Sequence, residues 1–326
     1  MMFVSKPTLA IVYGAICGGC DVALVNLGEK LVTILEKYDI LYWPAAVDSK
    51  RETLEKVSSI DVSIYMGTLT NSEEVELAKL VRSKSRVLIA YGTCAIYGGI
   101  PGLRALINAS QTLKEISSTT NTVEEVRLPR VAELPDLLDR VKSLIDVVEP
   151  DVIAPGCPPS DSVNETLVDI LVDYAKGAKL EGKVFIGDPN SLCSKCERKP
   201  PELSKISMPG IRRLHELKLV EDKCFLEQGV LCMGPVTRAT CDLPCIKNNL
   251  PCIGCSGPAL NVEDMGLEMV SVLSSILLVE REKELLEEGL SKELDKIVDL
   301  IGLLYRYTLP RSLLIKLKSS GGRNER

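Results

Sequence analysis

The sequence predicts an α/β protein whose first part is an open, doubly wound parallel sheet. Short apolar runs typical of buried strands alternate with stretches of helical periodicity over residues 1–190. Strand-helix alternation requires parallel strands joined by right-handed crossovers, so we expect a flavodoxin-like sheet. The expected strands are Leu9–Tyr13, Ile40–Trp43, Val62–Met66, Val87–Tyr91 and Val152–Ala154.

Three amphipathic helices are expected between these strands. The first helix follows Asp21 and carries apolar residues at helical spacing: Leu24, Leu27, Leu31, Ile34 and Leu35. The second helix starts at Asn71-Ser72, and the third starts at Ser162, where Glu165 completes a capping box. The polar connection over residues 98–129 receives no assignment.

The composition is that of a folded, water-soluble protein, with 45% hydrophobic and 26% charged residues. A net charge of −6 and an aromatic content of only 4% argue against nucleic acid as the main partner. The unusual feature is twelve cysteines beside a single histidine. That ratio points to metal or redox chemistry.

The N-terminal segment Thr8–Ile16, which follows Lys6 and precedes Cys17, superficially resembles a signal peptide. It lacks a cluster of positive charges and a small-x-small cleavage triplet, so a buried strand explains it better. The most apolar later stretch, Gly266–Val279, is too short and too polar for a membrane span. We therefore expect a cytoplasmic protein whose cysteines are not paired in disulfides.

The chain changes character after Gly187, where Asp188-Pro189-Asn190 marks a boundary. We expect three parts: a flavodoxin-like domain over residues 1–190, an irregular cysteine-rich domain over residues 191–262, and a C-terminal helical extension over residues 263–326. The cysteine-rich part has weak apolar periodicity, so bound metal would supply much of its folding energy. The extension is predicted from one apolar stripe: Leu286, Leu290, Leu294, Ile297, Ile301 and Leu304.

Four cysteines follow expected strands of the first domain. Cys17 and Cys20 lie in a Cys-Gly-Gly-Cys loop after the first strand, and Cys94 and Cys157 each follow a later strand. The carboxyl ends of parallel strands meet at one edge of the sheet, where such folds bind ligands. Four converging thiolates suit an iron-sulfur cluster, and twelve cysteines suit three [4Fe-4S] clusters.

Paired cysteines also serve other chemistries. A thioredoxin-like pair at Cys17 and Cys20 leaves ten cysteines unexplained. Zinc at one C-terminal site stays open, although the separation of Cys196 from Cys252 exceeds the spacing of compact zinc ribbons. No Cys-x-x-Cys pair continues into histidine, which excludes c-type haem, and the first loop lacks the ending of a phosphate-binding loop.

Five motifs together resemble the small subunit of nickel-iron hydrogenases. They are Cys17-Gly-Gly-Cys20, Gly92-Thr-Cys94-Ala-x-Tyr-Gly-Gly99, Gly156-Cys157-Pro-Pro159, Cys232-x-Gly-Pro-Val-Thr237 and Pro251-Cys252-Ile-Gly-Cys255. Within that family, the chain is most similar to cytoplasmic small subunits of the methyl-viologen-reducing type, found with heterodisulfide reductase in methanogens, and to the sulfhydrogenase delta subunit.

The resemblance implies an electron-transfer role and assigns every cysteine to a [4Fe-4S] cluster. The proximal cluster would take Cys17, Cys20, Cys94 and Cys157; the distal cluster Cys193, Cys196, Cys224 and Cys232; and the medial cluster Cys241, Cys245, Cys252 and Cys255. Hydrogen would be oxidised on a nickel-iron site in a separate large subunit, and electrons would leave to a ferredoxin-like, flavin or heterodisulfide reductase-linked subunit. No catalytic residue, nucleic acid partner or membrane span is expected on this chain.

The sequence departs from many family members at three positions. Cys193 stands where the first distal ligand is often histidine, Cys245 completes a fourth medial ligand, and Ile16 replaces a glutamate. An all-thiolate distal site predicts a lower potential than a site with imidazole. Four rival hypotheses remain: a complex I-like subunit, a hydrogen sensor, a relay with another partner, and a zinc-stabilised scaffold.

Overall fold

The computed structural model describes residues 6–119, 131, 133–202, 205–277, 293 and 295–321. The chain divides into two compact units. The first comprises residues 1–186 together with 307–326, and the second comprises residues 187–306. The first unit contains the sheet, and the second contains the eight cysteines from Cys193 to Cys255.

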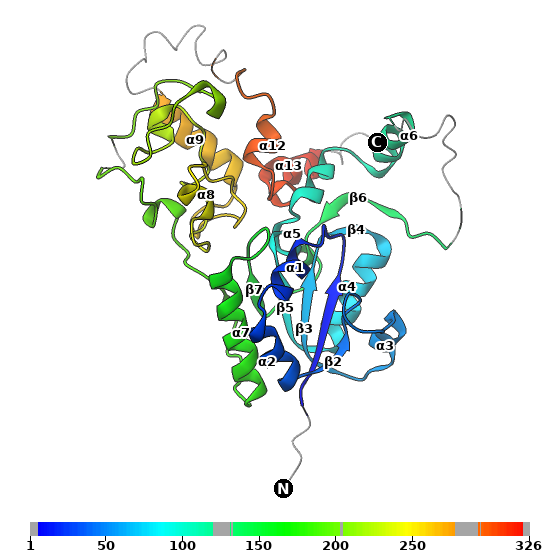
Figure 1. Cartoon of the computed structure of the whole chain (residues 1–326). Helices are drawn as coiled ribbons and strands as arrows, with labels where there is room; N and C mark the ends of the chain where they lie inside the picture. The colour runs from blue at the N-terminus through cyan, green and yellow to red at the C-terminus, as the bar shows by residue number, and fades with distance from the viewer. Residues whose placement is uncertain are drawn as a thin grey trace. The chain divides into compact units, whose positions relative to one another are not determined.

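A six-stranded parallel sheet forms the centre of the first unit (Figure 1). Its order is β2-β1-β3-β5-β7-β8, which is the predicted flavodoxin-like order extended by one edge strand. The strands are β1 (Thr8–Tyr13), β2 (Asp39–Tyr42), β3 (Ile60–Met66), β5 (Ser85–Tyr91), β7 (Val152–Ala154) and β8 (Val184–Phe185). The five expected strands are confirmed within two residues at each end, whereas the two-residue β8 was not foreseen.

Apolar side chains cover both faces of this sheet. Leu9 and Ile11 of β1 pack into one hydrophobic cluster, while the alternate residues Ala10 and Val12 pack into a second. Both faces are buried because helices lie on either side, as parallel sheets require. Helices α1 (Gly19–Val25), α2 (Glu29–Lys37) and α7 (Asp161–Ala175) cover the first face, and α3 (Arg51–Lys56) and α4 (Ser72–Lys84) cover the second (Figure 1).

Two of the predicted helices differ from expectation. The single helix expected after Asp21 is broken into α1 and α2, because Gly28 adopts a φ of +57° at the start of α2. Helix α7 begins two residues earlier than predicted, with Ser160 rather than Ser162 at its N-cap. The helix extends back to the residue that follows Pro159, where the proline-rich loop ends.

The connection left unassigned after Gly98 contains a 3₁₀ helix, η1 (Ile100–Leu106), and helix α6 (Ala109–Thr119). A short antiparallel pair follows, formed by β4 (Leu69–Asn71) and β6 (Leu137–Lys142). The C-terminal element η8 (Leu309–Arg311) returns to α5 (Thr93–Tyr97), and α13 (Leu313–Gly321) packs against η8. The backbone N–H of Gly99 donates to the carbonyl of Tyr307 at 3.1 Å, which ties the tail to the loop after Cys94.

The described elements of the cysteine-rich part are short and irregular, as predicted: the 3₁₀ turns η3 (Leu192–Ser194), η5 (Leu214–Glu216) and η6 (Leu226–Gln228), and the helix α8 (Pro244–Lys247). The second unit continues with the longer helix α9 (Met265–Leu277) and the short helix α12 (Leu300–Leu304). The apolar stripe expected over the C-terminal extension is wrong in part: Ile297 precedes α12, which starts anew because Asp299 caps it through the N–H of Gly302 at 2.7 Å. The stripe residues Leu286, Leu290 and Leu294 lie outside the described residues.

Within the described ranges, no helix combines the length and apolar character needed to cross a bilayer.

Helix α4 shows how local sequence fixes an element beside the sheet. Asn71 accepts a hydrogen bond from the N–H of Glu74 at 2.9 Å, and Glu74 accepts one from the N–H of Asn71 at 3.2 Å. The reciprocal pair is the capping box that starts α4.

Replacing Asn71 with alanine should lower the free energy of unfolding by about 1 kcal/mol, because α4 loses its cap while burying Ala78 and Val81. Asn108→Ala is the control. It removes the similar bonds between Asn108 and Gln111 from α6, a helix with no buried residue. Urea unfolding followed by circular dichroism checks both variants. Equal losses in the two would contradict this account.

Candidate functional site

Four cysteines lie on three loops at the carboxyl edge of the sheet. Cys17 follows β1, with Cys20 in the first turn of α1, while Cys94 lies in the first turn of α5 and Cys157 follows β7. These strands run parallel in one sheet, so the loops emerge on the same side. The sheet topology therefore places these cysteines, separated by up to 140 positions in sequence, at one edge.

The four thiols influence one another electrostatically. Burial raises the pKa of Cys94 to about 11, and Cys17 raises it further. Burial likewise raises the pKa of Cys157 to about 11, with Cys94 and Cys17 as further causes. The pKa of Cys20 rises most, through burial and then through Cys94, Cys157 and Cys17. A bound cation would reverse this balance by stabilising the thiolates.

Glycines form the walls around two of these thiols. A Cβ on Gly92 would lie 2.4 Å from Sγ of Cys20, and a Cβ on Gly99 would lie 2.3 Å from Sγ of Cys94. Both glycines also have positive φ, at +85° and +59°. The sulfur atoms therefore occupy the space that any larger residue at either position would need.

Hydrogen bonds join the loops that carry Cys94 and Cys157. The N–H of Thr93 donates to the carbonyl of Gly156 at 2.9 Å, and the N–H of Gly156 donates to Oγ1 of Thr93 at 3.1 Å. The hydroxyl of Tyr91 donates to Oδ1 of Asn164 at 2.6 Å, and both side chains are buried. The two loops and the start of α7 are thus held as one rigid edge.

Asp21 holds the first cysteine loop against the sheet. Its Oδ1 accepts hydrogen bonds from the hydroxyl of Tyr13 at 2.7 Å and from Nε1 of Trp43 at 2.8 Å. Asp21 directly follows Cys20, so these two bonds fix the start of α1. Sequence reasoning missed the positioning roles of Asp21 and Asn164; the one available signal for Asp21 is its place beside the Cys-x-x-Cys pair.

In the second unit, four cysteines line a cavity of about 330 Å³ with mainly apolar walls, to which Phe225 contributes. They are Cys193, Cys196, Cys224 and Cys232. Burial raises the pKa of Cys193 to about 12, with Cys232, Cys224 and Cys196 as further causes. Burial also raises the pKa of Cys232 to about 11. The cavity is several times the volume of a water molecule, about 30 Å³.

The remaining cysteines form two pairs in the same unit. Cys245 is among the groups that raise the pKa of Cys241, and Cys255 is among those that raise the pKa of Cys252, after burial in both cases. The N–H of Cys252 donates to Sγ of Cys232 at 3.3 Å. One of these pairs thus borders the cavity that holds Cys232.

All twelve cysteines lie in the described part of the chain, and no disulfide joins any two of them there. Among the described residues, no group of three or more histidine, cysteine, aspartate or glutamate side chains is arranged around a single ion. The structure thus brings together the first expected set and the set around the cavity. It shows the last four cysteines as two pairs.

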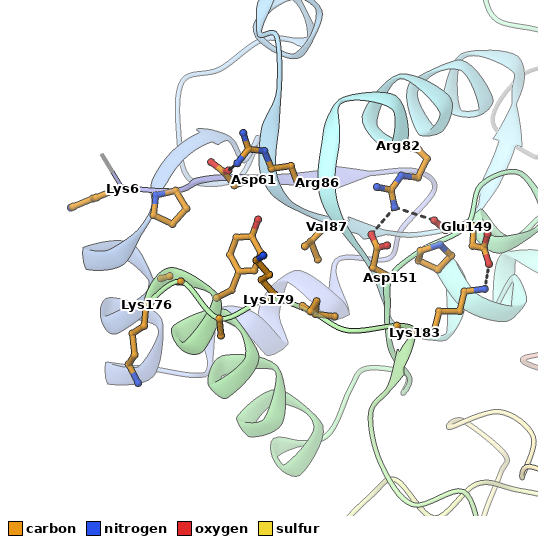
Figure 2. Close-up of a pocket in the computed structure, with 18 residues that line it drawn as sticks. Lys6, Asp61, Arg82, Arg86, Val87, Glu149, Asp151, Lys176, Lys179 and Lys183 are labelled. Carbon is orange, nitrogen blue, oxygen red and sulfur yellow. Dashed lines mark hydrogen bonds and ion pairs between the residues drawn. The ribbon is translucent and has the colours of Figure 1, made fainter. Parts of the chain in front are cut away.

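A wide groove of about 1,300 Å³ lies at the opposite, amino edge of the sheet (Figure 2). Its three carboxylates are each paired with a cation: Asp61 with Arg86 at 3.2 Å, Asp151 with Arg82 at 2.6 Å, and Glu149 with Lys183. Lys6, Lys176 and Lys179 add further positive charge. None of the residues lining the groove is a cysteine, so it is separate from the thiol sites.

The chain is similar to several known proteins. Residues 17–173 match the family described as NADH ubiquinone oxidoreductase, 20 Kd subunit. The G subunit of the F420-non-reducing hydrogenase of Methanothermobacter marburgensis is 37% identical over 310 residues, covering 94% of this chain and 95% of that protein. The iron-sulfur G subunit of the F420-non-reducing hydrogenase of Archaeoglobus profundus is 35% identical over 317 residues, covering 92% and 95%.

The delta subunit of sulfhydrogenase 2 of Pyrococcus furiosus is 29% identical over 262 residues, covering 80% of this chain and 90% of that protein. Among solved structures, a chain of an NAD⁺-reducing [NiFe]-hydrogenase is 28% identical with a TM-score of 0.48, covering 54% of this chain and 95% of that one.

The fold, the cysteine sites and the relatives define the chain as a subunit of an oxidoreductase. It belongs to the family of hydrogenase G subunits, the small subunits of nickel-iron hydrogenases. The resemblance found in its sequence motifs is confirmed.

Gly92→Ala should destabilise the protein more than Gly177→Ala. Both glycines have positive φ, at +85° and +96°, so both variants carry a backbone penalty, and the ψ of 153° at Gly92 is a conformation that essentially only glycine adopts. Only at Gly92 would the new Cβ meet a sulfur atom, whereas nothing lies within 4 Å at Gly177. Urea unfolding of the anaerobically purified protein measures the stability of both variants. Equal unfolding midpoints for the two variants would contradict the close packing of Cys20 against Gly92.

Proposed function

We propose that this chain is the iron-sulfur electron-transfer subunit of a nickel-iron hydrogenase complex. It would carry electrons from H2 oxidised in a separate large subunit to a further acceptor subunit, of ferredoxin-like, flavin or heterodisulfide reductase-linked type. The observation that carries the proposal is the placement of twelve cysteines, eleven of them at buried or half-buried positions, in a chain related to hydrogenase G subunits.

Three [4Fe-4S] clusters are the cofactors we propose, each supplying a one-electron carrier when bound. Cys17, Cys20, Cys94 and Cys157 would hold the proximal cluster, and Cys193, Cys196, Cys224 and Cys232 the distal cluster. Cys241, Cys245, Cys252 and Cys255 would hold the medial cluster. Two of these sets fit such groups: the glycines at positions 92 and 99 leave room for the sulfurs of Cys20 and Cys94, and the second set lines a 330 Å³ cavity.

The chain's own contribution is to orient thiols, limit water and set potentials. Backbone N–H groups already point at sulfur: Cys252 donates to Cys232 at 3.3 Å, and Gly254 donates to Cys252 at 3.4 Å. Such bonds favour the more negative, reduced state and raise the reduction potential. The all-thiolate donor set around Cys193 acts in the opposite direction, and the lower distal potential expected from it stays a prediction.

Two rival chemistries fit the observations less well. A thioredoxin-like redox pair would use only Cys17 and Cys20 and would leave the other ten cysteines without a role. A single zinc ion, bound at about 2.3 Å from each sulfur, needs far less space than the 330 Å³ cavity offers. A complex I-like relay fits the match over residues 17–173 but leaves the eight later cysteines without a role.

The order of electron flow can be tested with Cys94→Ser in the anaerobically purified complex. The variant should lose about four iron atoms per chain. Hydrogen should no longer reduce its remaining clusters, although dithionite still does, because the resemblance places the Cys94 cluster nearest the nickel-iron site. Iron analysis and electron paramagnetic resonance under H2 provide the measurement.

Cys224→Ser is the matched control. It should also lose about four iron atoms, yet its remaining clusters should still be reduced by H2. Met233→Leu, next to Cys232 and buried, should keep all its iron. If H2 reduced the remaining clusters of Cys94→Ser as fast as those of the unmodified complex, the proposed relay would be wrong.

A further inference from the structure

A buried arginine lines the cavity that contains Cys193, Cys196, Cys224 and Cys232. Arg198 is only 7% exposed, and it follows Cys196 by two positions. Within the described residues, no carboxylate forms an ion pair with it. A buried cation without a counter-ion is costly, so its presence beside four thiols calls for an explanation.

Arg198 links three cysteine-bearing segments. Its Nη1 donates to the carbonyls of Val220 and Lys223 at 3.3 and 3.4 Å, just before Cys224. Its Nη2 donates to Oδ1 of Asn249 at 2.7 Å, in the turn that leads to Cys252. The guanidinium group is therefore fixed in direction and cannot turn out to solvent.

The guanidinium also lies over an aromatic ring at the cavity wall. Its central carbon is 4.4 Å from the ring centroid of Phe225, a cation–π distance. Phe225 and Arg198 both line the cavity. Among the described residues, every partner of Arg198 is neutral, so no carboxylate there offsets its positive charge beside the thiols.

We propose that Arg198 is a positioning residue that raises the reduction potential of the cluster held by Cys193, Cys196, Cys224 and Cys232. This inference rests on the proposed function. When that cluster gains one electron, its charge becomes more negative by one, with no bond or proton changed at Arg198. A fixed cation stabilises the reduced form more than the oxidised form, and the apolar surroundings limit screening of this effect.

Two opposing charges act on the reduction potential at this site. Four thiolate ligands lower the potential, and Arg198 offsets part of that decrease. In a chain that has cysteine at position 193, the reduction potential of the outermost cluster would thus stay close to the potentials of the other clusters. Each electron transfer between clusters would then involve only a small difference in potential.

The test is a redox titration of the anaerobically purified complex, with cluster potentials read by electron paramagnetic resonance. Arg198→Gln should shift the one-electron equilibrium of one cluster about tenfold toward the oxidised form, equivalent to 59 mV. Arg198→Lys keeps the charge and should shift it less than about threefold. Lys199→Gln is the matched control, because Lys199 lines the same cavity but is exposed and screened.

A second variant changes the charge without removing the arginine. Asn249→Asp would place a carboxylate at the 2.7 Å contact, neutralise Arg198 and shift the same cluster in the same direction. Aspartate tolerates the positive φ of +58° at this position nearly as well as asparagine. Asn248→Asp adds the same charge on the exposed side of the turn and should shift the equilibrium less than about threefold.

The outcomes separate this inference from the proposed function. Unchanged potentials in both Arg198→Gln and Asn249→Asp, with iron retained, would overturn the role of Arg198 alone. An equal shift in Lys199→Gln would do the same. Loss of iron in both variants, with iron retained in Arg198→Lys, would show that Arg198 only holds the fold. Absence of iron from the unmodified protein would overturn the proposed function and this inference together.

Discussion

Thiolates buried close together repel one another, and each also loses the solvation of its charge. The structure places cysteines in this situation in both of its units. At the sheet edge, burial and neighbouring cysteines raise the pKa of Cys20, Cys94 and Cys157. Around the cavity of the second unit they do the same for Cys193. A metal group that withdraws this charge would turn the repulsion into ligand bonds and stabilise the fold that holds them.

The two units hold their cysteines in place by different means. In the first unit, a fully formed sheet with two apolar faces holds the loops, and Asp21 and Asn164 fix them. In the second unit, the described elements that carry or flank the cysteines are short 3₁₀ turns and one four-residue helix. There, hydrogen bonds from the Arg198 side chain join three segments of the chain, and the side chains that pack around the thiols form much of the core.

Sequence patterns predicted the sheet well because its strands are apolar on both faces and its crossovers follow a fixed hand. They failed where local and tertiary effects compete. Apolar periodicity runs through Gly28, yet its positive φ divides the helix there. The stripe through Ile297 likewise ignores Asp299, whose side chain starts a new helix. The two-residue β8 is too short to leave a periodic signal.

The candidate site was predictable only in its cysteines, whose role as ligands stays a prediction. Cysteine spacing and the strand ends identified all twelve thiols, because paired cysteines and glycine-rich loops stand out along the chain. Asn164 and Arg198 gave no such signal, and Asp21 gave only its place beside the Cys-x-x-Cys pair, since a single polar residue reveals its partner only when folding brings the two together. The electrostatic environment of the thiols therefore had to come from the structure.

The most direct test of the account is a count of iron, acid-labile sulfide, zinc and nickel in the complex purified anaerobically with its partners. The account predicts about twelve iron and twelve sulfide per chain of this protein, with nickel in a co-purifying large subunit. Zinc in place of iron would contradict it, and would leave the fold and the family without the electron-transfer role.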